Sequence, residues 1–199
     1  MAEPAKRLGE DERRMTAEEF LRRPDDADGT KYELVDGVLR AMSPATVHHG
    51  VIQAHIALRI GNYLLQANSS CRVATEPAIE IRVRANENRR IPDIGVTCST
   101  YAQQTVDLPE PILLVEILSP GNRKETMENV RAYMTIPSVQ EILVVNSVGF
   151  DVRLLKRQED GHWPTDFTNF DADGDITFES IGLTLPTNSL YPPAPSAEA

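Results

Sequence analysis

The sequence lacks the features that mark membrane-spanning and secreted proteins. None of its apolar runs approaches the roughly 20 consecutive apolar residues that a helix needs to cross a membrane. The first 15 residues are charged, whereas a secretory signal contains a continuous apolar stretch. We therefore expect a cytoplasmic protein with no membrane segment.

Cysteine is also scarce, since Cys71 and Cys98 are the only two in the chain. Zinc sites built on thiolates use short, repeated cysteine or histidine spacings, and these two residues form none. Two distant cysteines can form a disulfide only where the fold happens to place them together. We therefore expect two ordinary buried thiols and no zinc site.

Basic residues are too few for a general nucleic-acid-binding protein. The chain has 20 Lys and Arg against 30 Asp and Glu, a net charge of −10. Tight binding without sequence preference rests on a basic surface that neutralises phosphates, and the composition opposes it. Four arginines nevertheless cluster ahead of a Pro-Asp pair: Arg82, Arg84, Arg89 and Arg90. They form either a local basic rim or the solvated edge of a strand and its loop.

The remaining composition fits one globular domain. At 199 residues, with 41% hydrophobic and 25% charged residues, the chain can bury one substantial core. We place the domain at 15–191, between a polar, flexible N-terminus at 1–14 and a proline-containing, disordered tail at 192–199.

Three helices are expected from local signals. Thr-Ala-Glu-Glu at 16–19 forms a capping box, in which the hydroxyl and the last carboxylate bond the backbone at a helix start, so a short helix is predicted at 16–23. Apolar residues recur every three or four positions over 48–67, which predicts a long amphipathic helix. A third helix is expected at 124–135, ahead of a proline.

The strand pattern predicts a mixed sheet. Asp36-Gly37 between two β-type runs predicts a hairpin over 31–42. Further strands are expected at 72–83, 91–97, 112–118, 139–146, 150–157 and 176–181. The run 112–118 is apolar at almost every position, as in a central strand covered on both faces. The order of elements indicates an α/β fold with a mixed β-sheet flanked by helices.

One residue of that central run is a carboxylate, Glu116. An ionised carboxylate among such neighbours costs several kcal/mol, so it must be protonated, paired with a cation or bound to a metal. A second acid, Asp93, lies beside another short apolar stretch. Two carboxylates at the ends of neighbouring strands suit a divalent metal, while a protonated Glu116 in a purely structural core remains the alternative.

The chain contains an ordered set of motifs. They are Tyr32-Glu33-Leu34-Val35-Asp36-Gly37, Met42-Ser43-Pro44, His49 at a helix start, Pro92-Asp93, Val115-Glu116-Ile117-Leu118-Ser119-Pro120, and Tyr133 ahead of Ile136-Pro137-Ser138. This set, far more specific than any single motif in it, resembles the Uma-type restriction endonuclease family of the PD-(D/E)XK nuclease superfamily. The resemblance spans roughly residues 15–191.

The resemblance implies a restriction-endonuclease-like fold and a Mg²⁺-dependent (or Mn²⁺-dependent) endonuclease that hydrolyses DNA. It makes Asp93 and Glu116 the metal ligands and Glu33 a third acid of the site. The superfamily's lysine two residues after the glutamate is replaced here by Leu118. The family more often takes its lysine from the next helix, at the position of Asn129 here.

Other expectations depend on groups near these motifs. Three basic residues close to Asn129 in the sequence, Arg123, Lys124 and Arg131, could substitute for the lysine. His48 and His49 could face the site or merely begin the long helix. The alternative function is a catalytically degenerate nuclease-fold protein that acts as a nucleic-acid-binding or accessory module. A homodimer is also expected, with the strand at 150–157 extending a sheet across a two-fold axis.

Overall fold

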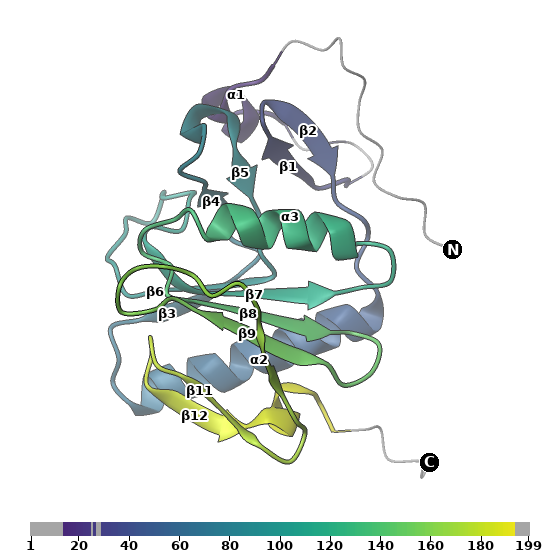
Figure 1. Ribbon diagram of the computed structural model, residues 1–199. Helices are drawn as coiled ribbons and strands as arrows, with labels where there is room; N and C mark the ends of the chain where they lie inside the picture. Colours follow the sequence, from purple (N-terminus) through teal and green to yellow (C-terminus); the bar gives the residue numbers. More distant parts are fainter. Residues whose placement is uncertain (1–13, 25, 27–28, 194–199) are drawn as a thin grey trace.

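The computed structural model describes residues 14–24, 26 and 29–193 (Figure 1). Its helices are α1 (Ala17–Leu21), α2 (Val47–Gln66) and α3 (Arg123–Tyr133), with 3₁₀ turns η1 (Ala85–Glu87) and η2 (Thr187–Leu190). Its strands are β1 (Tyr32–Val35), β2 (Val38–Ala41), β3 (Arg72–Thr75), β4 (Ile79–Glu80), β5 (Arg89–Arg90), β6 (Ile94–Thr97), β7 (Pro111–Leu118), β8 (Glu141–Asn146), β9 (Val152–Lys156), β10 (Thr168–Phe170), β11 (Asp175–Phe178) and β12 (Leu183–Pro186).

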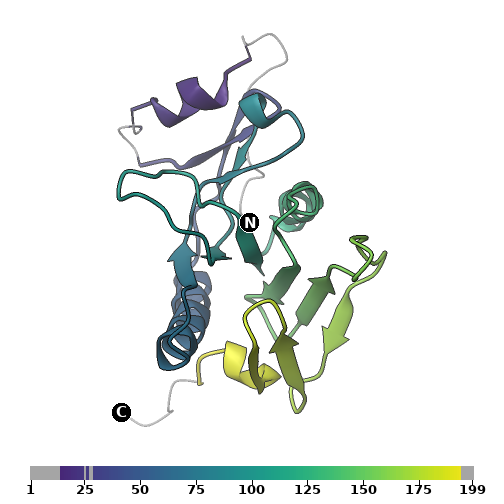
Figure 2. The same ribbon diagram turned by 90° about the vertical axis from the view of Figure 1, so that its left-hand side faces the viewer.

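The central layer is a six-stranded mixed sheet of order β10-β9-β8-β7-β6-β3. Helix α3 covers one face, and α2 with the β11–β12 hairpin covers the other (Figures 1 and 2). Strand β7 pairs parallel with β8 and antiparallel with β6. The parallel pair is possible because α3 connects the two strands as a crossover. The expected α/β fold with a helix-flanked mixed sheet is thus confirmed, and its central strand is the apolar run.

Side chains of β7 alternate between two cores, because successive residues of a strand point to opposite faces. Leu113, Val115 and Ile117 pack in the core under α2. Leu114 and Leu118 pack in the core under α3. Glu116 has the same parity as these two leucines, so its carboxylate lies on the α3 side.

A four-stranded sheet, β2-β1-β5-β4, lies beside the central sheet on the α3 side (Figure 1). The expected hairpin forms its outer half, with Asp36 and Gly37 both at positive φ, 51° and 79°. This is the tight turn that Asp-Gly favours. The capping box of Thr16 and Glu19 is present at α1. Both local predictions are therefore confirmed.

Several strand predictions were wrong in detail. The strand expected at 72–83 is two strands in different sheets, interrupted at Glu76, whose φ is +48°. Strands β5, β10 and β12 were not expected, because each is too short to show a clear apolar pattern. Strand β5 consists of two arginines alone. Strand β9 pairs with β10 as well as β8, so it is not a free edge. The surface expected to form a dimer is covered there, and a homodimer stays a prediction.

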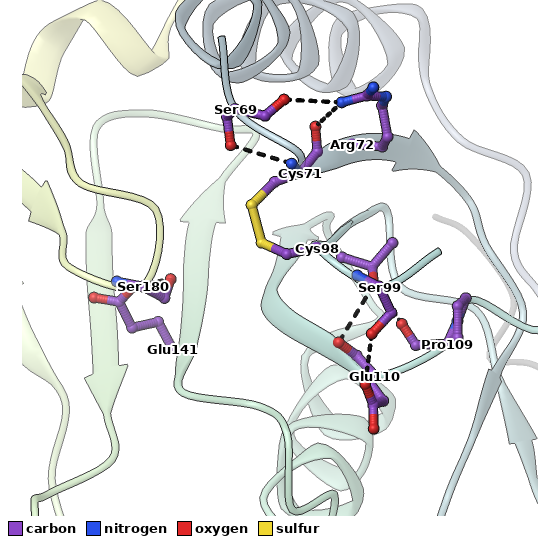
Figure 3. Close-up of a disulfide and its surroundings, with 10 residues drawn as sticks. Ser69, Cys71, Arg72, Cys98, Ser99, Pro109, Glu110, Glu141 and Ser180 are labelled. Atoms are coloured by element: carbon purple, nitrogen blue, oxygen red, sulfur yellow. Dashed lines mark hydrogen bonds between the residues drawn. A yellow bond between two sulfur atoms is a disulfide. The ribbon is translucent and has the colours of Figure 1, made fainter. Parts of the chain in front are cut away.

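The prediction of two free thiols was wrong, because Cys71 and Cys98 form a disulfide (Figure 3). Arg72 faces Thr97 in the antiparallel β3–β6 pair, so the two cysteines are the next cross-strand partners. Sequence separation hid this proximity, since it depends on the register of two strands. The bond fastens the edge strand β3 to the sheet.

The arginine cluster does not form a single rim. Arg82 and Arg84 are exposed, whereas Arg89 and Arg90 are buried. Arg89 bonds Asp107 and Glu80 and therefore acts within the fold. Both earlier interpretations, a rim and a solvated edge, are wrong for the two buried members.

The flanking segments lie mostly outside the described residues. Most of the flexible N-terminus expected at 1–14 and of the tail expected at 192–199 belongs to the undescribed part. Within the described ranges, no helix combines the length and apolarity that a membrane crossing requires.

Two neighbouring leucines of α2 provide a test of the packing. Leu64 is 3% exposed and Leu65 is 75% exposed. Leu64→Ala should lower the free energy of unfolding by about 2–5 kcal/mol, because it leaves a cavity between α2 and the sheet. Leu65→Ala is the matched control and should change it by less than about 0.5 kcal/mol. Chemical denaturation measures both, and equal losses would contradict the orientation of α2.

Candidate active site

Asp93 lies directly before β6, where this strand meets the end of β7. Its Oδ2 accepts a hydrogen bond from the backbone N–H of Ile117 at 2.6 Å. Its Oδ1 lies 2.8 Å from Nε2 of His49. Gln53 donates to the Asp93 carbonyl oxygen at 2.8 Å. The carboxylate is therefore fixed by both β7 and α2.

His49 comes from the first turn of α2, after the N-cap residue Thr46. Besides the contact with Asp93, its Nδ1 lies 3.0 Å from the hydroxyl oxygen of Ser119. Burial disfavours the charged imidazole, but the hydrogen bond and charge of Asp93 outweigh this effect and raise the pKa of His49. Of the two histidines weighed for the site, His49 faces it and His48 is exposed.

Glu116 is buried on the α3 side of β7, with 6% of its surface exposed. The Tyr133 hydroxyl of α3 donates to its Oε1 at 2.5 Å. Burial raises the pKa of Glu116 well above its usual value, and the nearby charge of Asp93 raises it further. The pKa of Tyr133 is also raised well above its usual value, by burial and then by the Glu116 charge. The strand acids, Asp93 and Glu116, therefore repel each other in a poorly solvated part of the protein.

Glu33 of β1 reaches the same region from the four-stranded sheet, and it is buried. Its Oε1 accepts from Nδ2 of Asn129 and from the backbone N–H of Ile91, both at 3.0 Å. Its Oε2 accepts from Arg40, with Nε at 3.1 Å and a second bond from Nη2. The structure thus brings Glu33 and Asn129 into direct contact, and both oxygens of Glu33 are fully hydrogen-bonded.

Two arginines accompany the acids. Arg40 of β2 joins Glu33 to α3, because it also bonds Asn129 and, at 3.1 Å, Glu128. Arg90 donates to the carbonyl oxygen of Leu34 at 2.6 Å, and its buried Nε has no partner among the described residues. Burial lowers the pKa of Arg90.

The donor set suits Mg²⁺ or Mn²⁺. Among the described residues, no three His, Cys, Asp or Glu side chains form a metal-binding group. Mg²⁺ commonly takes only one or two carboxylates and completes its shell with water. Asp93 and Glu116 provide two, and a cation held by them would offset the Asp93 charge, which adds to burial in raising the pKa of Glu116. Their hard oxygen donors therefore fit the metal that the sequence suggested.

Sequence reasoning missed two contributors to the site and left a third undecided. Arg40 carried no local signal, and Tyr133 had served only as a motif landmark. His49 had been left between a site role and a helix-start role. Three basic residues were considered as substitutes for a lysine, and all three are exposed on α3: Arg123, Lys124 and Arg131. The basic group in contact with Asn129 is instead Arg40.

A protein-family model named Uma2 and described as "Putative restriction endonuclease" matches residues 17–187. An uncharacterized protein of Synechocystis sp. (strain PCC 6803) is 26% identical over 180 residues, which cover 89% of this chain and 92% of that protein. A solved structure from Anabaena variabilis, described as "a putative nuclease belonging to DUF820", has a TM-score of 0.67 at 19% identity. It covers 89% of this chain and 97% of its own, and at this identity it shows the fold alone.

The raised pKa of Glu116 predicts a pH-dependent effect of neutralising it. Its pKa in the folded protein lies above the ordinary value of 4.5. The stability gained from its protonated form is therefore complete below that value and is lost as pH rises through the folded pKa. In EDTA, Glu116→Gln should raise the unfolding temperature near neutral and alkaline pH and change it little in acid.

Thermal denaturation across pH measures this effect, and each kcal/mol corresponds to about 2–4 °C for a chain of this length. Glu159→Gln, at an exposed position, is the control and should leave the profile unchanged. A Glu116→Gln variant that is less stable than wild type at alkaline pH would show instead that the ionised carboxylate is stabilised in the fold.

Proposed function

Since the chain belongs to the Uma2 family of restriction-endonuclease-like proteins, we propose that it is a metal-dependent endonuclease that hydrolyses DNA phosphodiester bonds. The observation that carries the proposal is the pair of strand acids, Asp93 and Glu116. Their negative charges repel each other where β6 meets the end of β7. A buried arrangement of this kind is typical of functional sites rather than of structural cores.

Asp93 and Glu116 would hold Mg²⁺ or Mn²⁺, which when bound neutralises phosphate charge and lowers the pKa of a water. The protein's own groups fix both carboxylates. Tyr133 donates to Glu116, while His49 and the Ile117 amide hold Asp93. Such support leaves each carboxylate little freedom, which favours a precise ligand geometry.

A second candidate is a nuclease-fold protein that binds DNA without cutting it. Two observations favour it. Asn129 is neutral where the family resemblance suggests a lysine, and Glu33 has both oxygens committed to neighbouring donors. The net charge of −10 further limits how tightly either version could bind DNA without a metal.

Supercoiled-plasmid nicking with Mg²⁺ or Mn²⁺ tests the proposal. Asp93→Asn and Glu116→Gln should each lower the rate by at least about 100-fold, the scale on which single groups that stabilise transition-state charge act. Asp160→Asn removes an exposed acid and should retain the wild-type rate. EDTA should abolish nicking.

Wild-type protein that binds DNA in the presence of either metal but never nicks it would favour the second candidate. Nicking that survives both site substitutions would contradict the assignment of the site.

A further inference from the structure

Arg40 is the basic group that the fold buries in direct contact with Glu33 and Asn129. Arg40 lies in β2 of the four-stranded sheet, whereas Glu116 lies in β7 of the central sheet and Asp93 directly before β6. Its charge nevertheless acts on Glu116, where it offsets a small part of the effects that raise the pKa of that carboxyl. Arg40 therefore belongs electrostatically to the same site as Glu116.

The guanidinium is held in a defined orientation. Its Nε–H and one Nη2–H donate to Glu33, the other Nη2–H donates to Asn129, and one Nη1–H donates to Glu128. A guanidinium has five N–H groups. Within the described part of the chain these bonds use four of them, and one N–H on Nη1 remains for a ligand.

We propose that Arg40 supplies the positive charge that contacts the scissile phosphodiester, and that Asn129 is a positioning residue that aims its guanidinium. The assignment rests on the proposed function and names the basic group of that site. A guanidinium stays charged at every accessible pH, so Arg40 would stabilise phosphate charge and take no part in proton transfer.

Other basic groups are less suited to this role. Arg90 keeps a buried Nε without a partner among the described residues, but its hydrogen bond goes to the Leu34 carbonyl oxygen, whereas Arg40 bonds both Glu33 and Asn129. The basic residues of α3 are exposed, whereas Asn129 and Tyr133 are buried.

A purely structural role for Arg40 would consist in neutralising buried Glu33. A double-mutant cycle separates the two roles, with Arg40→Met, Glu33→Gln and the combined variant. Removing both partners leaves no uncompensated buried charge, so the combined variant should remain folded even if Arg40→Met alone does not. Thermal denaturation checks this first.

The readout is the dissociation constant of a short fluorescent DNA duplex in Ca²⁺, together with nicking in Mg²⁺. In the Glu33→Gln background, Arg40→Met should still weaken binding and slow nicking by at least about tenfold. An unchanged pair of values in that background would show that Arg40 acts only through Glu33 and would overturn the proposal. Arg59→Met, at an exposed position of α2, is the matched control and should bind as wild type does.

Rescue from the neighbouring position gives a second test. Combining Arg40→Met with Asn129→Lys should recover nicking to within about tenfold of wild type, because a cation returns next to Glu33. The same variant with Asn129→Gln should recover nothing. Since lysine titrates and arginine does not, the rescued variant should lose activity at a lower alkaline pH than wild type.

Failure of this inference and failure of the proposed function give different results. Wild-type protein that neither binds nor nicks DNA with any of these metals would overturn the proposed function and the role of Arg40 with it. Wild-type nicking that Arg40→Met leaves unchanged would overturn the role of Arg40 alone.

Discussion

The site depends on a buried electrostatic conflict between Glu116 and Asp93. Strand β7 is otherwise apolar on both faces, so water does little to stabilise a carboxylate there. Placing a second acid at the adjoining end of β6 increases the conflict. A structural core would gain stability from an apolar residue at position 116. We therefore propose that the two acids are kept to hold a cation, because they do not add to the stability of the metal-free fold.

Asp93 also shows how the layers of the fold determine the site. Its side chain receives one bond from β7 and one contact from α2, and its carbonyl oxygen receives another from α2. Glu116 is held from the opposite layer through Tyr133 of α3. Since α2 bonds Asp93 from one face of the sheet and α3 bonds Glu116 from the other, a shift of either helix would displace a carboxylate. The geometry of the site is therefore coupled to the packing of the whole sheet.

How much the sequence predicted depended on the range of each interaction. Local signals identified the hairpin turn at Asp36-Gly37, the capped helix start at Thr16 and the central strand around Glu116. The partners that were missed are non-local. The Cys71–Cys98 disulfide follows from the register of β3 against β6, and the contact between Arg40 and Asn129 joins residues 89 positions apart. No local pattern contains either relation, because each depends on how separate elements pack.

The position of Arg40 changes what the acidic composition means. A net charge of −10 describes the field of the whole molecule at a distance, where salt screens it within about 10 Å. Contact with a phosphate depends instead on charges within a few ångströms of the site, where Arg40 and Arg90 lie close to Glu33. With Glu33 neutralised by Arg40, a divalent cation held by Asp93 and Glu116 would remove most of the negative charge around the site. An acidic protein can therefore hold a site suited to a phosphodiester, and its affinity for DNA would then depend on the bound metal.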